Sequence, residues 1–296
     1  MKVGLSVALA SCVAALPLRS AWACASCSAG DPALLGSGVE QPFEGRLRLS
    51  LSTREWSDAT GSGASLETMH ELRFDLGVAW SPLSWLTLVL DLPLAHRWLD
   101  GDSGGIARGF GPGELELGAR AAIWRDREKA TTHRLSVGAM LKLPTAVLLR
   151  DAVGMPKPLD VQLGTGSVDP RIELAYAGRF GRWTVLAGTS LTLPIGGWML
   201  LRPAPGWRTT ASVQLQPLPM FAIRAGLEAR YEGVPLLAGV RDPMGSGFLG
   251  AVTPGLLFSP TPDVVLDFGA TIPVIERRVD AASAPLFSAA IAVDLG

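Results

Sequence analysis

The 296-residue sequence has little charge, cysteine or histidine, and no long hydrophobic run after its N-terminal segment. Charged residues make up 18% of the chain, which has three cysteines and three histidines. A membrane-crossing helix needs about 20 consecutive apolar residues, so a protein of several such helices is excluded. The formal net charge of −1 provides no basic surface, which excludes nucleic acid as a partner.

Apolar side chains and chain breakers are abundant instead. Hydrophobic residues account for 48% of the chain, beside 34 glycines and 22 prolines. So many glycines and prolines interrupt helices too often for a helix-rich fold. The composition therefore favours a β-rich protein.

Residues 1–23 are predicted to be a signal peptide. Lys2 supplies the positive start, an apolar run follows, and Ala21-Trp22-Ala23 has the small-x-small form of a cleavage site. Pro17 and Arg19 interrupt the run before it reaches the length of a membrane anchor. The sequence thus predicts export from the cytoplasm.

Cys24 and Cys27 form a C-x-x-C pair at the start of the mature chain. Outside the cytoplasm such a pair forms a local disulfide or remains as two unused thiols. Lipid attachment at Cys24, thiol exchange and a copper or zinc site are the alternatives. A metal would need further ligands, and only His70, His96 and His133 are available. We expect no cofactor, and keep a metal at Cys24 and Cys27 as a minor alternative.

Beyond residue 42, apolar and polar residues alternate with a period of two. In residues 71–80, for example, apolar side chains at even positions alternate with Glu71, Arg73 and Asp75. This period is typical of β-strands. About 12 strands are predicted, at 46–52, 71–80, 86–94, 114–121, 134–143, 168–178, 183–194, 207–216, 220–231, 247–258, 263–275 and 285–295.

The connections between these strands alternate in length. Short turns are predicted at 81–84, 180–182, 217–219 and 260–262, and long loops at 57–67, 99–112, 146–166, 197–206, 233–245 and 277–283. Short periplasmic turns and long extracellular loops are typical of outer-membrane barrels.

The two faces of the predicted strands differ in charge. One face carries both signs of charge, and the other is almost free of charge. Tryptophans occur at strand ends, where a membrane barrel has its aromatic girdle: Trp56, Trp80, Trp85, Trp98, Trp124, Trp183, Trp198 and Trp207. In a transmembrane barrel the charged face is the lumen, so we expect arginine to be tolerated better at inward Ser50 or Gly118 than at lipid-facing Leu49, Leu88 or Leu117.

The predicted fold class is therefore all-β, a transmembrane antiparallel up-and-down barrel of about 12 strands over residues 43–296. Residues 24–42 lack the alternation, so they are expected in the periplasm or as a plug in the lumen. The predicted location is the outer membrane of a Gram-negative type envelope, with outer-membrane lipid as a partner.

Four short motifs give the sequence a family resemblance. Glycine-rich segments precede two strands, at 109–115 (GFGPGEL) and 163–170 (LGTGSVDP), and two strands end in Leu-Pro, at 141–145 (LKLPT) and 191–194 (LTLP). On these motifs the chain resembles the outer-membrane barrel family associated with the MetA pathway of phenol degradation. The resemblance implies a transporter that takes up small, aromatic or otherwise apolar solutes.

Two features that suggest an enzyme are not accompanied by the residues catalysis needs. Residues 101–105 spell GDSGG, the nucleophile motif of chymotrypsin-like proteases, but His70 and His96 lack the setting of the required base. In a long loop the same residues make a flexible turn. His133 and Ser136 have opposite strand parity and point to different faces. The sequence is therefore interpreted as a non-enzyme.

Charged residues on the inward face are the candidate functional residues. They are Arg46, Arg48, Arg73, Asp75, Asp91, Glu116, Arg120, Lys142, Arg171, Glu173, Arg224, Glu228 and Arg230. They could select a small-molecule solute, or they could pair and fill the lumen. The mixture of signs argues against a strongly ion-selective pore. A passive channel is the leading interpretation, and a non-conducting structural or interaction barrel and a metal-handling protein are the alternatives.

Overall fold

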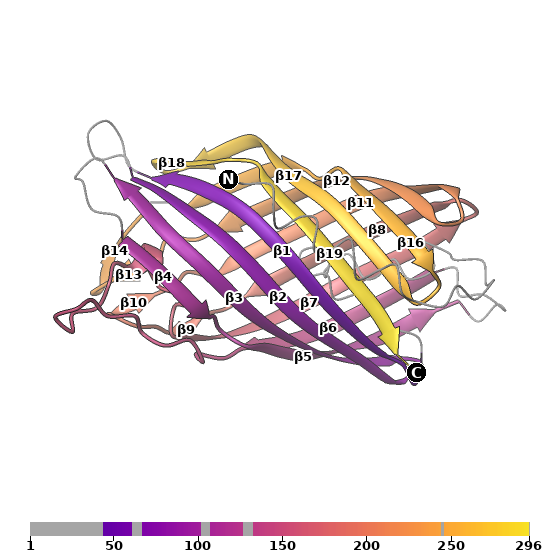
Figure 1. The fold of residues 1–296 in the computed structure, drawn as a ribbon, viewed down its shortest axis with the longest axis horizontal. Coiled ribbons are helices and arrows are strands. Elements are labelled where there is room, and N and C mark those ends of the chain that lie inside the picture. The colour runs from indigo at the N-terminus through magenta and orange to yellow at the C-terminus, as the bar shows by residue number, and fades with distance from the viewer. Residues whose placement is uncertain (1–43, 61–66, 102–106, 127–132, 244–245, 296) are drawn as a thin grey trace.

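The structure is a computed structural model that describes residues 44–60, 67–101, 107–126, 133–243 and 246–295. These residues form a closed antiparallel barrel, in which β1 pairs with β2 on one side and with the last strand, β19, on the other (Figure 1). Among them, no helix is long and apolar enough to cross a membrane.

Twelve strand positions make up the wall, and two of them are interrupted. They are β1 (Leu47–Thr60), β2 (Glu67–Leu83), β3 (Leu86–Gly101), β4 (Ala107–Pro112) continued by β5 (Glu116–Arg125), β6 (His133–Lys142), β7 (Ser167–Phe180), β8 (Trp183–Thr192), β11 (Gly206–Leu218), β12 (Phe221–Glu232), β15 (Gly247–Val252) continued by β16 (Gly255–Thr261), β17 (Val264–Arg278) and β19 (Leu286–Leu295). The predicted fold class, including its strand number, is confirmed.

Short elements occupy the long connections. They are the 3-10 turn η4 (Leu159–Val161), β9 (Ile195–Gly196), β10 (Leu201–Arg202), β13 (Leu236–Leu237), β14 (Val240–Arg241) and β18 (Ala281–Ser283). Strands β10, β13 and β14 form a separate small sheet, and β9 pairs with β7. The strands β9, β10, β13, β14 and β18 lie toward the left end of the barrel in Figure 1, opposite the end where β19 finishes.

The expected loop at 99–112 is partly wrong. Residues 107–112 form β4 and pair with β3, with Arg97 opposite Gly109 in the register. Strands β1 and β3 also extend beyond their predicted ends. Glycine-rich sequence looks like a loop locally, but pairing with a long neighbour makes it a strand.

The outward face of the wall is apolar, as predicted. Leu49, Leu88 and Leu117 are 39%, 40% and 38% exposed, whereas inward Ser50 and Thr87 are buried. A soluble protein has the reverse arrangement, with apolar groups inside. Because closure pairs the backbone groups of every strand edge, such a wall can stand in lipid.

Most of the predicted aromatic girdle is confirmed. Five tryptophans near strand ends are exposed on the outside: Trp80, Trp85, Trp124, Trp183 and Trp207. Trp98 stacks on His70 with ring centroids 5.1 Å apart. The expectation for Trp56 is wrong, because it shares the inward parity of Arg54 and lines a lumen cavity with it.

Gly118 has less room for a side chain than this expectation assumes. A Cβ at Gly118 would lie 2.3 Å from the sulfur of Met140 and 2.4 Å from the carbonyl oxygen of Ala139. The side chain of Met140 therefore covers the inner face of β5 at this position.

The outward face generates a stability test. We expect Leu90→Arg, which puts a charge on the lipid side of β3, to lower the free energy of unfolding in lipid vesicles by about 2–4 kcal/mol. The control is Val153→Arg, since Val153 is 83% exposed in a loop and should change stability by less than about 0.5 kcal/mol. Equal losses in a urea titration would mean that the apolar face of β3 does not contact lipid.

Candidate functional site

Ion pairs fill much of the lumen. Most of the charged residues predicted to face inward take part in them. The pairs join Arg73 to Asp75, Arg120 to Glu173, Arg171 to Glu116 and Glu173, Lys142 to Glu114 and Asp169, Arg208 to Glu228, Arg224 to Asp267, and Arg230 to Glu232. Arg46 differs, because it precedes β1 and bonds the exposed Asp263 at 2.6 Å. Pairing compensates for the loss of hydration that buried charges suffer.

The most buried pair joins the first strand to the last. Arg48 donates from Nε to Asp294 Oδ1 at 2.5 Å and from Nη2 to Oδ2 at 2.7 Å. Both side chains are 1% exposed, and the two residues are register partners between β1 and β19. This two-bond contact therefore stands where the barrel closes.

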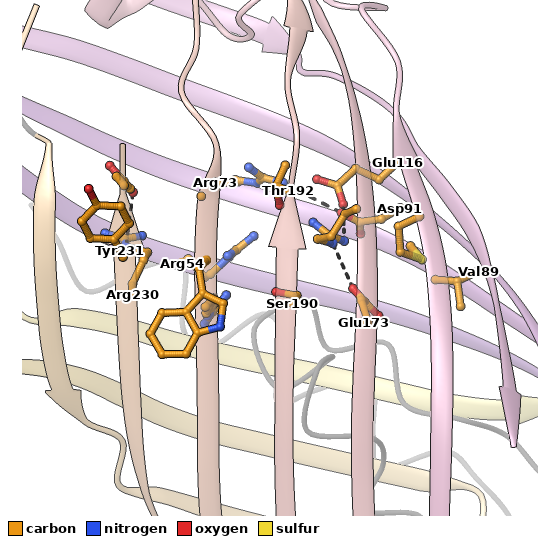
Figure 2. A pocket seen from close by; sticks show the side chains of 16 residues that line it. Arg54, Arg73, Val89, Asp91, Glu116, Glu173, Ser190, Thr192, Arg230 and Tyr231 are labelled. Carbon is orange, nitrogen blue, oxygen red and sulfur yellow. Dashed lines mark hydrogen bonds and ion pairs between the residues drawn. The ribbon is translucent and has the colours of Figure 1, made fainter. Parts of the chain in front are cut away.

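The first of two cavities in the lumen has both signs of charge on its walls. We call it the mixed cavity; its volume is about 310 Å³. Its charged lining consists of Arg54, Arg73, Asp91, Glu116, Arg171, Glu173, Arg208, Arg230 and Glu232. In Figure 2, Glu116, Asp91 and Glu173 lie to one side, and Arg54 and Arg230 to the other.

The second cavity, of about 280 Å³, is lined mainly by cations, and we call it the arginine cavity. Among the described residues its charged lining consists of Arg54, Arg73, Arg97, Arg208, Arg224 and Arg230, with Glu71 and Glu228. Trp56 and several small apolar residues of β15, β17 and β19 complete it. Six arginines thus face a space that only two carboxylates share.

Four arginines line both cavities. Arg54 and Arg73 are register partners on β1 and β2, and Arg208 and Arg230 are register partners on β11 and β12. We call these four side chains the arginine quartet. Like charges directly opposite each other in a sheet repel, so each pair destabilises the wall unless acids or a ligand compensate.

Asp75, the acid that compensates two arginines of the quartet, lies in the wall and away from the cavities. Asp75 accepts from Arg54 at 2.7 Å and from Arg73 at 2.5 Å, and its side chain is 0% exposed. It lines neither cavity. The carboxylate is therefore embedded in the wall, while the guanidinium groups reach the lumen.

The long loop of residues 143–166 packs inside the mouth of the barrel. Gly109 shares the inward face of Arg97, its register partner, and a Cβ at Gly109 would lie 2.1 Å from the carbonyl oxygen of Val161. Val161 is fully buried. Glycine at position 109 thus lets the backbone of the loop lie directly on β4.

The two glycine-rich motifs of the sequence meet in this contact. The carboxylate of Glu114 accepts a hydrogen bond from the backbone N–H of Gly166 at 2.6 Å and forms an ion pair with Lys142. Lys142 also pairs with Asp169 at 2.7 Å. Segments 109–115 and 163–170, 50 residues apart in the chain, are therefore two sides of one interface.

Gln162 and Arg97 hold the loop in place. The Gln162 side chain accepts from Leu149 N–H at 2.8 Å and donates to the carbonyls of Leu149 and Lys157. Arg97 donates to the backbone carbonyl of Gln162 at 2.5 Å and to Glu71. Arg97 also lines the arginine cavity, so the loop and the cavity share one side chain.

Several of these residues were not among the sequence candidates. Arg54, Glu71, Arg97, Arg208 and Asp294 all have the inward parity of the residues that were chosen. Arg54 and Arg97 lie beyond the predicted ends of their strands. Extending the alternation outward by two or three residues would have found both.

Two predicted features lie outside the described residues. Cys24 and Cys27 precede residue 44, and residues 102–105 of the GDSGG motif fall in a gap between described segments. Within the described segments, no three His, Cys, Asp or Glu side chains gather as they would around a metal ion.

Comparison with known proteins identifies the fold. No protein-family profile and no curated sequence matches the chain. A crystal structure of an outer-membrane channel from Pseudomonas putida F1 matches with a TM-score of 0.67 and 14% identity, over 88% of this chain and 98% of that one. The translocator domain of the autotransporter NalP from Neisseria meningitidis matches with a TM-score of 0.51 and 12% identity, over 90% of this chain and 93% of that one. The chain is an outer-membrane β-barrel, which confirms the predicted location.

The closure pair generates a second test. We expect Asp294→Asn to lower the free energy of unfolding by about 3–5 kcal/mol, because it replaces the buried carboxylate that accepts two charge-assisted hydrogen bonds from Arg48. Asp263→Asn removes the exposed partner of Arg46 and should cost no more than about 1 kcal/mol. Urea titration in detergent measures both variants, and similar losses would show that closure does not depend on the Arg48 contact.

The contact between the 143–166 loop and β4 generates a third test. In Gly109→Ala the new methyl group overlaps the Val161 carbonyl, so the loop must move away from β4. We expect trypsin to cut severalfold faster after Arg150, which lies in this loop. Gly206→Ala is the control, since its nearest atom is 3.7 Å away. Equal cutting rates in both variants would argue against the docking of the loop on Gly109.

Proposed function

We propose that this protein is a passive outer-membrane channel for small solutes, whose path runs through the lumen. The observation that carries the proposal is the pair of cavities, of about 310 and 280 Å³, inside a closed wall. Charged side chains from strands between β1 and β12 face these cavities. Eight of the thirteen sequence candidates line one or both cavities: Arg73, Asp91, Glu116, Arg171, Glu173, Arg224, Glu228 and Arg230. Asp75 and Arg120 pair with residues of this lining.

Two further points support the proposal. The Pseudomonas putida protein of similar fold is described as an outer-membrane channel. The resemblance of the 109–115 and 163–170 motifs implies small, aromatic or otherwise apolar solutes, and residues 1–23 are proposed to export the chain. Residues 24–42 are proposed to lie in the periplasm or in the lumen.

A non-conducting structural barrel is the second candidate. The side chain of Met140 favours it, because it covers the inner wall at Gly118 and narrows the lumen beside the mixed cavity. The two candidates differ in one measurable property, which is current through a bilayer.

Insertion of a bulky side chain tests the lumen path. Ser190 lines the mixed cavity, and Leu191 beside it faces outward with 36% exposure. We expect Ser190→Trp to lower the single-channel conductance severalfold, because the indole occupies the cavity, and Leu191→Trp to leave it unchanged.

Wild-type protein in a planar bilayer supplies the reference. Conductance steps in wild type that Ser190→Trp alone reduces support the channel. Silence of the wild type in every salt would favour the non-conducting barrel, and equal conductance of both variants would place the path elsewhere.

A further inference from the structure

The arginine cavity has the chemistry of an anion site. Six guanidinium groups line it against the carboxylates of Glu71 and Glu228. Other acids that pair with these arginines lie away from it: Asp75 is embedded in the wall, and Asp267 is not part of the lining. The cavity is therefore more cationic than the overall composition of the lumen.

The arginine quartet keeps unused capacity for hydrogen bonds. Arg54 and Arg73 share the single carboxylate of Asp75. Arg208 bonds Glu228 through Nη2 at 2.7 Å, and its side chain is 41% exposed. A guanidinium presents five N–H donors in a plane that matches a carboxylate, so donors remain for a ligand.

The surface that the quartet presents to the arginine cavity favours an anionic ligand. The four guanidinium groups have four carboxylates as ion-pair partners, Asp75, Asp91, Glu228 and Glu232. Of these four carboxylates, Glu228 alone lines the arginine cavity. On the side of that cavity, the four guanidinium groups therefore face one of their own partners.

The wall between β1 and β12 contributes apolar side chains to the cavity. Leu249, Pro254, Ala270, Pro273, Ala284 and Leu286, which we call the apolar wall, line it together with the hydroxyl groups of Thr253, Thr271, Ser283 and Ser288. Trp56 lies on β1 beside Arg54. Ligand sites of this kind combine apolar walls with a few polar groups that orient the ligand. The volume of about 280 Å³ lies at the small end of the range for such sites.

We propose that the arginine cavity binds a small organic monocarboxylate, with the carboxylate on the arginine quartet and the hydrocarbon part against the apolar wall. This assignment deepens the proposed channel function and rests on it, because the carboxylate would be the solute or a solute analogue. A solute that is apolar and also anionic accounts for both walls of the cavity.

Calorimetric titration of the full chain in detergent tests the site without requiring conductance. The probes are benzoate, its neutral analogue benzamide, and acetate, which lacks the ring. We expect saturable benzoate binding, and affinities for benzamide and acetate that are at least about tenfold lower, since a charge-assisted contact or a buried ring contributes that much.

The test variant is Arg54→Gln combined with Arg230→Gln. In it Asp75 keeps Arg73, and the side chain of Glu232 is 46% exposed, so no buried carboxylate loses its only partner. We expect benzoate affinity to fall at least about tenfold. Arg46→Gln, which alters an arginine outside both cavities, is the control and should bind benzoate as wild type does.

Three results would overturn the proposal: no benzoate binding by wild type, equal affinity for benzoate and benzamide, or unchanged affinity in the double variant. Equal affinity for benzoate and acetate would overturn the role of the apolar wall. Failure of the channel function is seen separately, as wild-type protein that binds benzoate yet stays silent in a bilayer.

Discussion

A closed barrel in lipid has one place for its charged side chains, which is its lumen. The outward positions of the wall contact acyl chains, where a charge costs about 2–4 kcal/mol at mid-membrane. Every strand therefore sends its arginines, aspartates and glutamates inward, into a narrow space with little water. How those charges are compensated there determines which parts of the lumen are filled and which are open.

Compensation is uneven around the wall. At the closure, Arg48 and Asp294 satisfy each other completely and leave no exposed surface. Near β5 and β7, Arg120 and Arg171 share Glu173, and Arg171 and Glu173 also line the mixed cavity. On β1 and β2, Arg54 and Arg73 share Asp75, which is embedded in the wall, and both arginines line the arginine cavity. The cavities thus border charges that are paired in different ways.

The sequence predicted the wall well and the contacts within it poorly. Alternation is a local property set by the pleat of the strand. Leu49, Leu88 and Leu117 could therefore be assigned to the outside from the residues next to them in the sequence. The partner of Arg48 lies 246 positions away, at Asp294. Register between the first and last strands has no local signature, and Glu228 likewise pairs with Arg208 on the next strand, which the sequence did not indicate.

Composition alone does not show where each charge lies in the lumen. Counting acids and bases on inward positions suggested a lumen without a preference for either sign, but a count does not distinguish Asp75, which is enclosed by the wall, from Arg54 and Arg73, which reach the cavity. The arginine side chain is longer than that of aspartate. At the same height in the barrel, Arg54 and Arg73 therefore extend into the cavity while Asp75 stays in the wall. Side-chain length, as well as charge, therefore sets the sign that a solute meets.

The loop of residues 143–166 also affects the charge that the arginine cavity presents. Arg97 donates both to Glu71 and to the carbonyl of Gln162, and it faces the arginine cavity. The loop backbone can reach Arg97 because Gly109 has no side chain. If the loop moved off β4, Arg97 would lose an acceptor and present more free donors to the cavity. The position of the loop and the charge of the cavity are thus coupled through one guanidinium, which links the mouth of the barrel to its interior.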